Sequence, residues 1–378
     1  MTITEQEFEL DPEIVYLNHA AVAPWPKRTK EAVIQFAEEN SHVGAKNYAR
    51  WQDKERELRK QFKDLLNAAS PDDIALVKNT SEALSFVAYG LDWRAGDNVV
   101  TSSEEFPSNR IPWESLKAQG VELRQADIDT EDPEQALFQQ VDKHTRLITV
   151  SSVQYATGRR MHLEKIGAFC RKRNLLFCVD AIQSLGAFQS DVQCWQADFV
   201  MADGHKWLLG PEGLGVFYST PTARDRLSLT QYGWHMVEKA GDYDNPGWEI
   251  AASARRFECG SPNMLGIHAL GASLSLLLEV GLDAIEARVL DNARYLIDKI
   301  LAEPMLTLLS PTHPAQRSGI VTFKPTQADS QALFHFLRQQ NIICAHRGGG
   351  IRFSPHFYTS KEALERALDA VRQFLALN

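Results

Sequence analysis

The sequence is poor in cysteine and carries no paired cysteine motif. Its 378 residues include five cysteines, an odd number, and these are widely spaced with no CxxC pair. Neither a disulfide framework nor a zinc-ligand spacing can be built from them. We therefore expect free, reduced thiols.

Long apolar runs and concentrated positive charge are also missing. No apolar run approaches the length needed to span a bilayer, and the acidic N-terminal segment MTITEQEFELDPE lacks the basic and apolar regions of a signal peptide. The 49 acidic and 40 basic residues are interspersed and give a net charge of −9. Nucleic acids and membranes are thus poor partners, and we expect a cytoplasmic protein.

What the sequence does contain is an alternation of short apolar runs and helical segments, from about Val15 to Phe217. This alternation is typical of an α/β fold with a mostly parallel sheet. The expected strands begin at Asp97, Thr145, Leu175, Ala197 and Gly213, and the clearest crossover helices at Ser81 and Leu163.

The pattern changes after the Gly-Ser-Pro-Asn run that begins at Gly260. Two long helical segments follow, and then the apolar runs SGIVTFKP and GIRFSP with helices between and after them. We predict a large domain over 15–260 and a smaller C-terminal α+β domain over 261–378, with residues 1–14 packing on the smaller one.

One lysine stands where α/β proteins present reactive groups. In ADFVMADGHKW an apolar strand leads into a polar turn that presents Lys206. In VDAIQS, Asp180 ends another strand and Gln183 follows three residues later. This set of groups suits a cofactor that contains a pyridine ring. A carboxylate beside the pyridine nitrogen would keep that nitrogen protonated, and the protonated ring is an electron sink. Taken singly, Lys206 also fits a surface cation and Asp180 an N-cap.

The segment KNTSEALSF predicts a helix start that suits a phosphate. Thr80 and Ser81 offer hydroxyl groups and free backbone N–H groups at the positive end of a helix dipole. The alternative is a plain capping box, because Asn79 and Glu82 have the required spacing.

Seven motifs in order, NTSEA, EEFPSN, VQYATG, VDAIQS, DGHKW, FECGSPN and GIRFSP, resemble the class V aminotransferase family, which includes cysteine desulfurases, selenocysteine lyases and isopenicillin N epimerase-like proteins. The resemblance runs from about Tyr16 to Tyr358. It implies the fold type I of pyridoxal phosphate (PLP)-dependent transferases, with a large domain and a smaller one.

The resemblance implies roles around the cofactor ring. Lys206 would hold PLP as a Schiff base and Asp180 would pair with the pyridine nitrogen. Gln183 would bind the ring oxygen, with Gln154 close to the same atom. Phe106 would stack on the ring, although a core aromatic is the alternative at that position.

Other residues would bind the phosphate and the substrate. Thr80, Ser81 and His205 would contact the phosphate, and Asp203 stands nearby, where relatives commonly have a serine. Ser261 would reach the phosphate of a neighbouring subunit, which implies a homodimer with a shared site.

An amino acid substrate would bind at Arg352 and Asn18. An arginine suits bidentate binding of a carboxylate, whereas a surface salt bridge is the alternative for Arg352.

Two departures from the family argue against sulfur transfer. Phe106 replaces the histidine that desulfurases use for proton transfer, and a phenyl ring has no titratable group. The stretch NIICAHRGGGIR is also too short for the mobile loop that carries their nucleophilic cysteine, while Cys344 sits in an apolar run.

We therefore predict a PLP-dependent enzyme that acts at the α-carbon or amino group of an amino acid, by aminotransferase, epimerase or β-lyase chemistry. The alternatives are a cysteine desulfurase or selenocysteine lyase, and a non-catalytic PLP-binding protein. A dinucleotide-binding fold is excluded because no GxGxxG follows an early strand.

Overall fold

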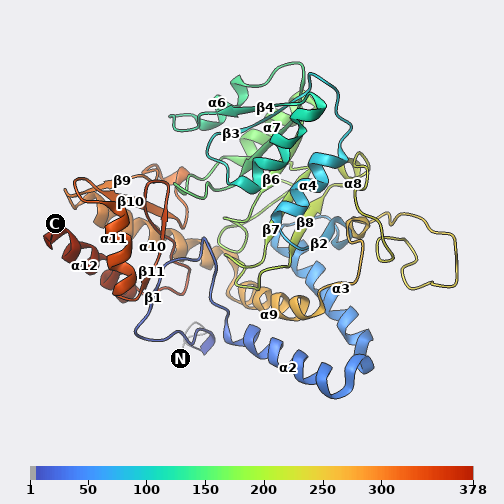
Figure 1. Cartoon of the computed structure of the whole chain (residues 1–378), viewed down its shortest axis with the longest axis horizontal. Coiled ribbons are helices and arrows are strands. Elements are labelled where there is room, and N and C mark those ends of the chain that lie inside the picture. Colours follow the sequence, from blue (N-terminus) through green and yellow to red (C-terminus); the bar gives the residue numbers. More distant parts are fainter. Residues whose placement is uncertain (1–5, 378) are drawn as a thin grey trace.

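The structure is a computed structural model that describes residues 6–377 (Figure 1). Its centre is a seven-stranded sheet with the strand order β2-β8-β7-β6-β5-β3-β4. Neighbouring strands from β7 to β4 are parallel, whereas β8 is antiparallel to both β7 and β2. The strands span Ile74–Val77 (β2), Asn98–Ser102 (β3), Glu122–Ala126 (β4), Thr145–Ser151 (β5), Leu176–Asp180 (β6), Phe199–Asp203 (β7) and Gly215–Ser219 (β8). The predicted α/β class with a mostly parallel sheet is confirmed.

Both faces of this sheet are covered, which explains why its strands are apolar throughout. In β6, Phe177 and Val179 belong to the core on one face, and Leu176 and Cys178 to the core on the other. The faces are covered by helices that connect the strands: α4 (Thr80–Gly90), α5 (Ile111–Glu114), α6 (Pro133–Gln139), α7 (Leu163–Arg173) and α8 (Pro221–Arg224).

Local sequence signals set the ends of these helices. Asn79 caps α4 by accepting a hydrogen bond from the backbone N–H of Glu82 at 2.9 Å. Helix α7 has three basic residues in its last turn and ends at Asn174, whose φ of 54° is left-handed. The sequence predicts starts at Ser81 and Leu163, and the helices begin at Thr80 and Leu163.

The C-terminal part contains a second, antiparallel sheet with the order β12-β13-β10-β9. The strands are Leu306–Leu308 (β9), Val321–Pro325 (β10), Ala345–Arg347 (β12) and Gly350–Phe353 (β13). They pack with α10 (Leu282–Leu301), α11 (Ser330–Gln339) and α12 (Lys361–Leu377) around a core of their own. Figure 1 shows this part as a separate lobe in orange and red.

The N-terminal segment is attached to this lobe. Strand β1 (Val15–Tyr16) pairs in parallel with β11 (Ile342–Ile343), and the ring of Phe8 stacks on that of Tyr358 at a centroid distance of 3.4 Å. The expected packing of residues 1–14 on the smaller domain stays a prediction, and residues 1–5 lie outside the described residues.

Three long helices lie beneath the central sheet. Helix α9 (Met264–Val280) packs against α2 (Lys27–Val43) and α3 (Tyr48–Leu65), and its buried leucines belong to the core of the larger lobe. The division into 15–260 and 261–378 stays a prediction, and α9 and β1 make contacts across it. Among the described helices none alone is long and apolar enough to cross a membrane; α9 and α10 reach that length only as a pair bent by 85°.

Candidate active site

A cavity of about 330 Å³ lies where strands of the large sheet end. Asp180 closes β6 and Asp203 closes β7, and both line this cavity together with Lys206. In α/β folds the carboxyl ends of parallel strands form the binding crevice. The cavity is therefore where the fold predicts a site.

Lys206 and Asp180 are both buried in this cavity, at 9% and 1% exposure. The amine of Lys206 lies 5.6 Å from the ring centroid of Phe106, and no described carboxylate lies within 4 Å of it. Burial lowers the pKa of the Lys206 amine, while the nearby Asp180 charge opposes that shift. Burial raises the pKa of the Asp180 carboxyl, and Glu105 raises it further. The amine is thus poised to become neutral and nucleophilic.

The two glutamines of the prediction have different surroundings. Gln183 lines the cavity; its Nε2 donates to the carbonyl of Ala20 at 3.0 Å, and its Oε1 accepts from Trp207 Nε1 at 2.9 Å. One N–H of Gln183 stays available for a ligand. Gln154 is fully buried, does not line the cavity, and donates to Glu105 at 2.9 Å. The ring-oxygen role of Gln154 stays a prediction.

Unsatisfied polar groups gather beside the start of α4. Thr80 Oγ1 and His205 Nδ1 are buried without a hydrogen-bond partner, and both residues line the cavity. Ser81 donates to Ser108 at 2.9 Å. Buried polar atoms normally have partners, and a helix N-terminus attracts anions. A phosphate at this position would satisfy Thr80 Oγ1, whereas His205 Nδ1 already lies near a carboxylate.

Asp203 also lies in this part of the cavity, at 7% exposure. Its Oδ1 accepts a hydrogen bond from the backbone N–H of Gly204 at 2.8 Å and lies 3.3 Å from His205 Nδ1. The carboxylate therefore faces the imidazole of the same turn.

Arg352 also lines the cavity and is 2% exposed. Its Nη1 donates to the carbonyl of Tyr155 at 2.7 Å, and its Nε has no partner. Burial lowers its pKa to about 10, assisted by the charge of Arg347. A buried guanidinium without a carboxylate partner is costly, and an anionic ligand would relieve that cost. The surface salt bridge alternative is therefore wrong for this residue.

Asn18 does not line the cavity, although Ala20, Ala21 and Val22 of the same segment do. Its Oδ1 is buried without a partner, and its backbone forms a bridge with Ser354. Its substrate-binding role stays a prediction.

Glu105, which the sequence reasoning did not single out, is a central acceptor beneath the site. It is 5% exposed and accepts hydrogen bonds from Ser102, Asn109, Gln154 and Ser151, the last from both its backbone N–H and its hydroxyl. Glu105 stands in the EEFPSN motif beside Phe106. Its position shortly after the end of a strand is the sequence feature that could have identified it.

Ser261 lies apart from these residues. It is exposed and lines a different cavity, of about 180 Å³, with Lys78 and Glu82. One chain therefore does not bring Ser261 to its own Lys206.

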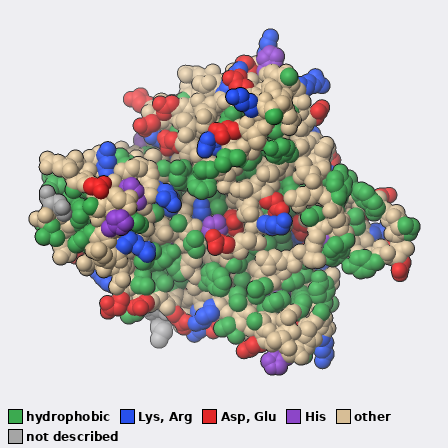
Figure 2. Space-filling model, in the orientation of Figure 1, with side chains coloured by type: hydrophobic (Ala, Val, Ile, Leu, Met, Phe, Trp, Pro, Cys, Tyr) green, Lys and Arg blue, Asp and Glu red, His purple; other side chains and the backbone are tan. Residues whose placement is uncertain are grey.

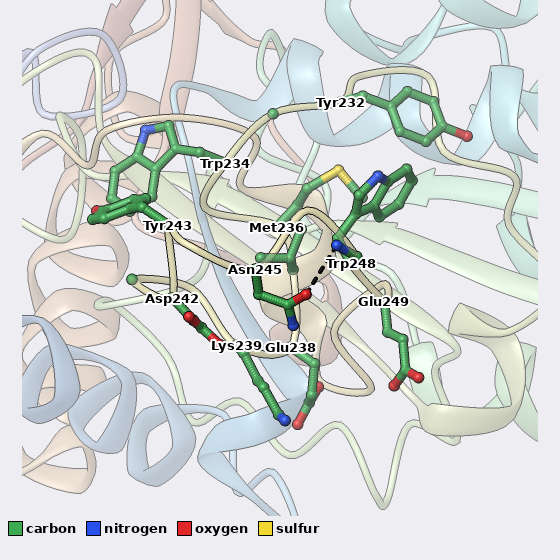
Figure 3. Close-up of a pocket in the computed structure, with 14 residues that line it drawn as sticks. Tyr232, Trp234, Met236, Glu238, Lys239, Asp242, Tyr243, Asn245, Trp248 and Glu249 are labelled. Atoms are coloured by element: carbon green, nitrogen blue, oxygen red, sulfur yellow. Dashed lines mark hydrogen bonds between the residues drawn. The ribbon is translucent and has the colours of Figure 1, made fainter.

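A larger cavity, of about 790 Å³, lies within the projecting segment 232–249 (Figure 3). It is lined by aromatic side chains that are largely exposed, with Tyr243 at 75% and Trp248 at 60%. Figure 3 shows the acidic side chains Glu238 and Glu249 pointing away from these rings. Hydrophobic side chains also gather over this projection at the right of Figure 2. Exposed apolar patches of this kind are typical of contact surfaces, and this cavity shares no lining residue with that of Lys206.

The chemistry of the Lys206 cavity fits PLP. Lys206 offers an amine for an aldehyde, and Asp180 offers a buried carboxylate for a ring nitrogen. The cavity of about 330 Å³ lies between these groups and lacks an ion pair between the amine and a described carboxylate. Thr80 leaves a buried hydroxyl unsatisfied that a phosphate would satisfy.

Comparison with known proteins agrees with this assignment. The model of the family "Aminotransferase class-V" matches residues 15–366. A probable cysteine desulfurase of Methanothermobacter thermautotrophicus is 30% identical, with 93% of this chain and 92% of the relative covered. A probable cysteine desulfurase of Pyrococcus abyssi is 29% identical, with 98% and 96% covered.

Solved structures share the fold. The apo structure of the cysteine desulfurase from Thermococcus onnurineus NA1 has a TM-score of 0.89 and 25% identity, and covers 99% of this chain and 98% of its own. The cystine C–S lyase C-DES in complex with cysteine persulfide has a TM-score of 0.88 and 23% identity, with 95% and 97% covered. From the family match, the curated relatives and the site, the chain belongs to the aminotransferase class-V family of PLP-dependent enzymes.

Proposed function

We propose that this enzyme holds PLP on Lys206 and acts at the α-carbon or amino group of an amino acid, by transamination, epimerisation or β-elimination. The observation that carries the proposal is the buried Lys206 amine in one cavity with a buried carboxylate, the orphaned Thr80 hydroxyl and a buried arginine without an acidic partner.

PLP, when bound, supplies an electron-withdrawing ring that makes the α-proton of an amino acid easier to remove. Asp180 would keep the ring nitrogen protonated. Thr80, Ser81 and His205 would hold the phosphate at the start of α4, and Phe106 would cover one face of the ring. These residues would hold the cofactor in the same cavity as Lys206.

Arg352 would bind the α-carboxylate of the substrate through its guanidinium. Lys206 would then move the proton at the α-carbon, because its buried amine has a lowered pKa and accepts a proton near neutral pH. Where the proton is returned, or which group leaves, distinguishes the three reactions.

A second candidate is cysteine desulfurase activity, which the names of several relatives favour. All five cysteines are described, and none of them lines the Lys206 cavity. Cys344 is 3% exposed, and burial raises its pKa to about 12, so it is a poor nucleophile. The geometry therefore favours chemistry without a protein-bound persulfide. Release of sulfide by elimination from a sulfur amino acid stays compatible with it.

We also propose a homodimer with a shared site, in which Ser261 of one chain reaches the phosphate bound by its partner. The exposed position of Ser261 and the exposed aromatic side chains of segment 232–249 support this assembly.

The five unpaired cysteines fit the expected cytoplasmic location.

The test is the visible spectrum of the purified protein, wild type and Lys206→Ala. We expect an absorbance band in the wild type that is lost or altered in the variant. Amino acids are then screened for spectral change, and for keto acid, sulfide or altered chirality. A colourless wild type after addition of PLP contradicts the proposal, and bound cofactor without any turnover favours a non-catalytic protein.

A further inference from the structure

A second arginine stands beside Arg352 in the same hairpin. Strands β12 and β13 pair so that Ala345 lies opposite Arg352 and Arg347 lies opposite Gly350. Residues opposite each other in an antiparallel pair share a face, and side chains alternate along each strand. Arg347 and Arg352 are thus diagonal neighbours on one face, and both line the Lys206 cavity.

The hairpin holds Arg347 in a fixed position. Its two turn residues, Gly348 and Gly349, have φ values of 60° and 75°, which is the pattern of a tight two-residue turn. A Cβ at Gly348 would lie 3.1 Å from that of Ala156, so the turn packs closely on the segment after Tyr155. Gly350 has no side chain that could cover the Arg347 stem. Arg347 therefore belongs to the cavity wall and not to a long loose loop.

Neither guanidinium has an acidic partner in the described part of the chain. Arg347 Nη1 donates to the carbonyl of His346 at 3.0 Å, and no described carboxylate lies within 4 Å of Arg347 or Arg352. Two acids, Asp180 and Asp203, line the cavity on the side assigned to the cofactor.

Glu212, the remaining acid of the cavity, is exposed and beyond 4 Å from both arginines. Two like charges on neighbouring positions repel each other. Anionic ligand groups would offset that repulsion, and a substrate with two acid groups could pair with each arginine separately.

We infer that Arg347 binds an acid group on the substrate side chain, so that the preferred substrate is an acidic amino acid. The α-carboxylate lies on the buried Arg352 and the side-chain acid on Arg347 at the rim of the cavity. This assignment rests on the proposed function, because it deepens the role of the same cavity.

The test compares acidic amino acids with their amide isosteres on the PLP-loaded enzyme. L-aspartate and L-asparagine, and L-glutamate and L-glutamine, are titrated while the visible band of the cofactor is followed, and kcat/KM is measured for each. A charge-assisted hydrogen bond to a guanidinium is strong, and we expect the acid of one pair to bind roughly 10- to 100-fold more tightly than its amide.

Variants at Arg347 then locate the preference. Arg347→Gln is expected to reduce the acid-to-amide ratio to near one, and Arg347→Lys to keep part of it because the charge stays while the planar geometry is lost. Arg288→Gln removes an exposed arginine of α10 outside the cavity and should keep the wild-type ratio.

The outcomes separate this inference from the proposed function. Equal affinity for acid and amide in the wild type, or an unchanged ratio in Arg347→Gln, overturns the role of Arg347 while reaction with neutral amino acids still supports the proposed function. If no amino acid changes the spectrum of the PLP-loaded protein, both proposals fail. The wild-type comparison is decisive even if Arg347→Gln fails to fold.

Discussion

Asp180 is the residue whose chemistry can be tested most directly. Its buried carboxyl accepts one backbone hydrogen bond, from Ile182 at 3.0 Å, and lines the Lys206 cavity. We expect Asp180→Asn to keep the visible band, because Lys206 still holds PLP, and to lower kcat by roughly 10²- to 10³-fold through loss of a preorganised charge. The measurement is kcat with the best substrate, together with the cofactor spectrum.

The control for Asp180 is Asp298→Asn, which changes an exposed carboxylate on α10. Its kcat should equal that of the wild type. Full activity in Asp180→Asn would show that this carboxylate does not act on the ring.

We expect the buried His19 to make the free energy of unfolding depend on pH. It is fully buried; its Nδ1 lies 2.8 Å from the Ser354 carbonyl and its Nε2 2.6 Å from the Tyr358 hydroxyl. Burial lowers its pKa from 6.5 to about 4, although the Ser354 contact opposes the shift. The unfolded chain therefore binds this proton more tightly than the fold does.

The stabilisation associated with neutral His19 is present above pH 6.5 and is lost as the pH falls toward 4, by on the order of 3 kcal/mol. Chemical unfolding followed between pH 7 and 4 should show a shallower pH dependence for His19→Gln than for wild type. His335→Gln, which changes an exposed histidine, should keep the wild-type slope. Equal slopes for all three proteins would contradict this account.

At the same scale, the sequence predicted the residues that stand next to strand ends and helix starts. Four residues could be predicted in this way, because each stands at the boundary of a motif and lines the crevice that the fold forms there: Lys206, Asp180, Gln183 and Thr80. Arg347 could not be predicted, since its place depends on the pairing of β12 with β13. A shift of one residue in that pairing would turn its side chain to the other face.

At the scale of elements, the loop that carries Lys206 depends on a close backbone approach. Gly186 has a φ of 96°, and a Cβ there would lie 2.4 Å from the carbonyl oxygen of Trp207. We expect Gly186→Ala to lower the free energy of unfolding by roughly 2–5 kcal/mol, from left-handed strain plus overpacking. Displacement of Trp207 should also weaken PLP binding. Thermal unfolding and a PLP titration measure the two effects.

Gly213→Ala is the matched control for this prediction. Gly213 also has a positive φ, of 82°, but a Cβ there would meet no atom within 4 Å. Only the strain of about 1–2 kcal/mol is therefore expected. If both variants lose the same stability, the close approach of Gly186 to Trp207 contributes nothing.

The strands of the large sheet were largely predictable because each is an apolar run buried on both faces. The expected runs from Asp97, Thr145, Leu175, Ala197 and Gly213 all contain observed strands. Strand β4 was not expected: its residues Glu122–Ala126 include exposed and half-buried polar side chains, since it lies at the edge of the sheet. An edge strand has less of the apolar signal on which such predictions depend.

At the scale of the whole molecule, the projecting segment 232–249 predicts self-association. Trp248 is 60% exposed on this segment. We expect the wild type to sediment as a dimer, and Trp248→Asp to shift the equilibrium toward monomer by burying a charge in the contact. Loss of the partner's Ser261 should weaken PLP retention in parallel. Sedimentation velocity and the visible band report the two effects.

Leu301→Asp changes an equally exposed apolar residue, at 57%, outside this segment. It should leave the dimer intact. A wild type that sediments as a fully active monomer would contradict the shared site.

Strand β1 has a consequence for how the molecule is made. Val15 and Tyr16 leave the ribosome long before their partners Ile342 and Ile343, because most of the sheet-forming chain lies between them. Synthesis at roughly 5–20 residues per second separates the two by tens of seconds. The wall formed by Ala20, Ala21 and Val22 directly follows β1 and lines the Lys206 cavity. The nascent chain can therefore assemble its central sheet before β11 exists, but it acquires a closed Lys206 cavity only after β11 has been synthesised.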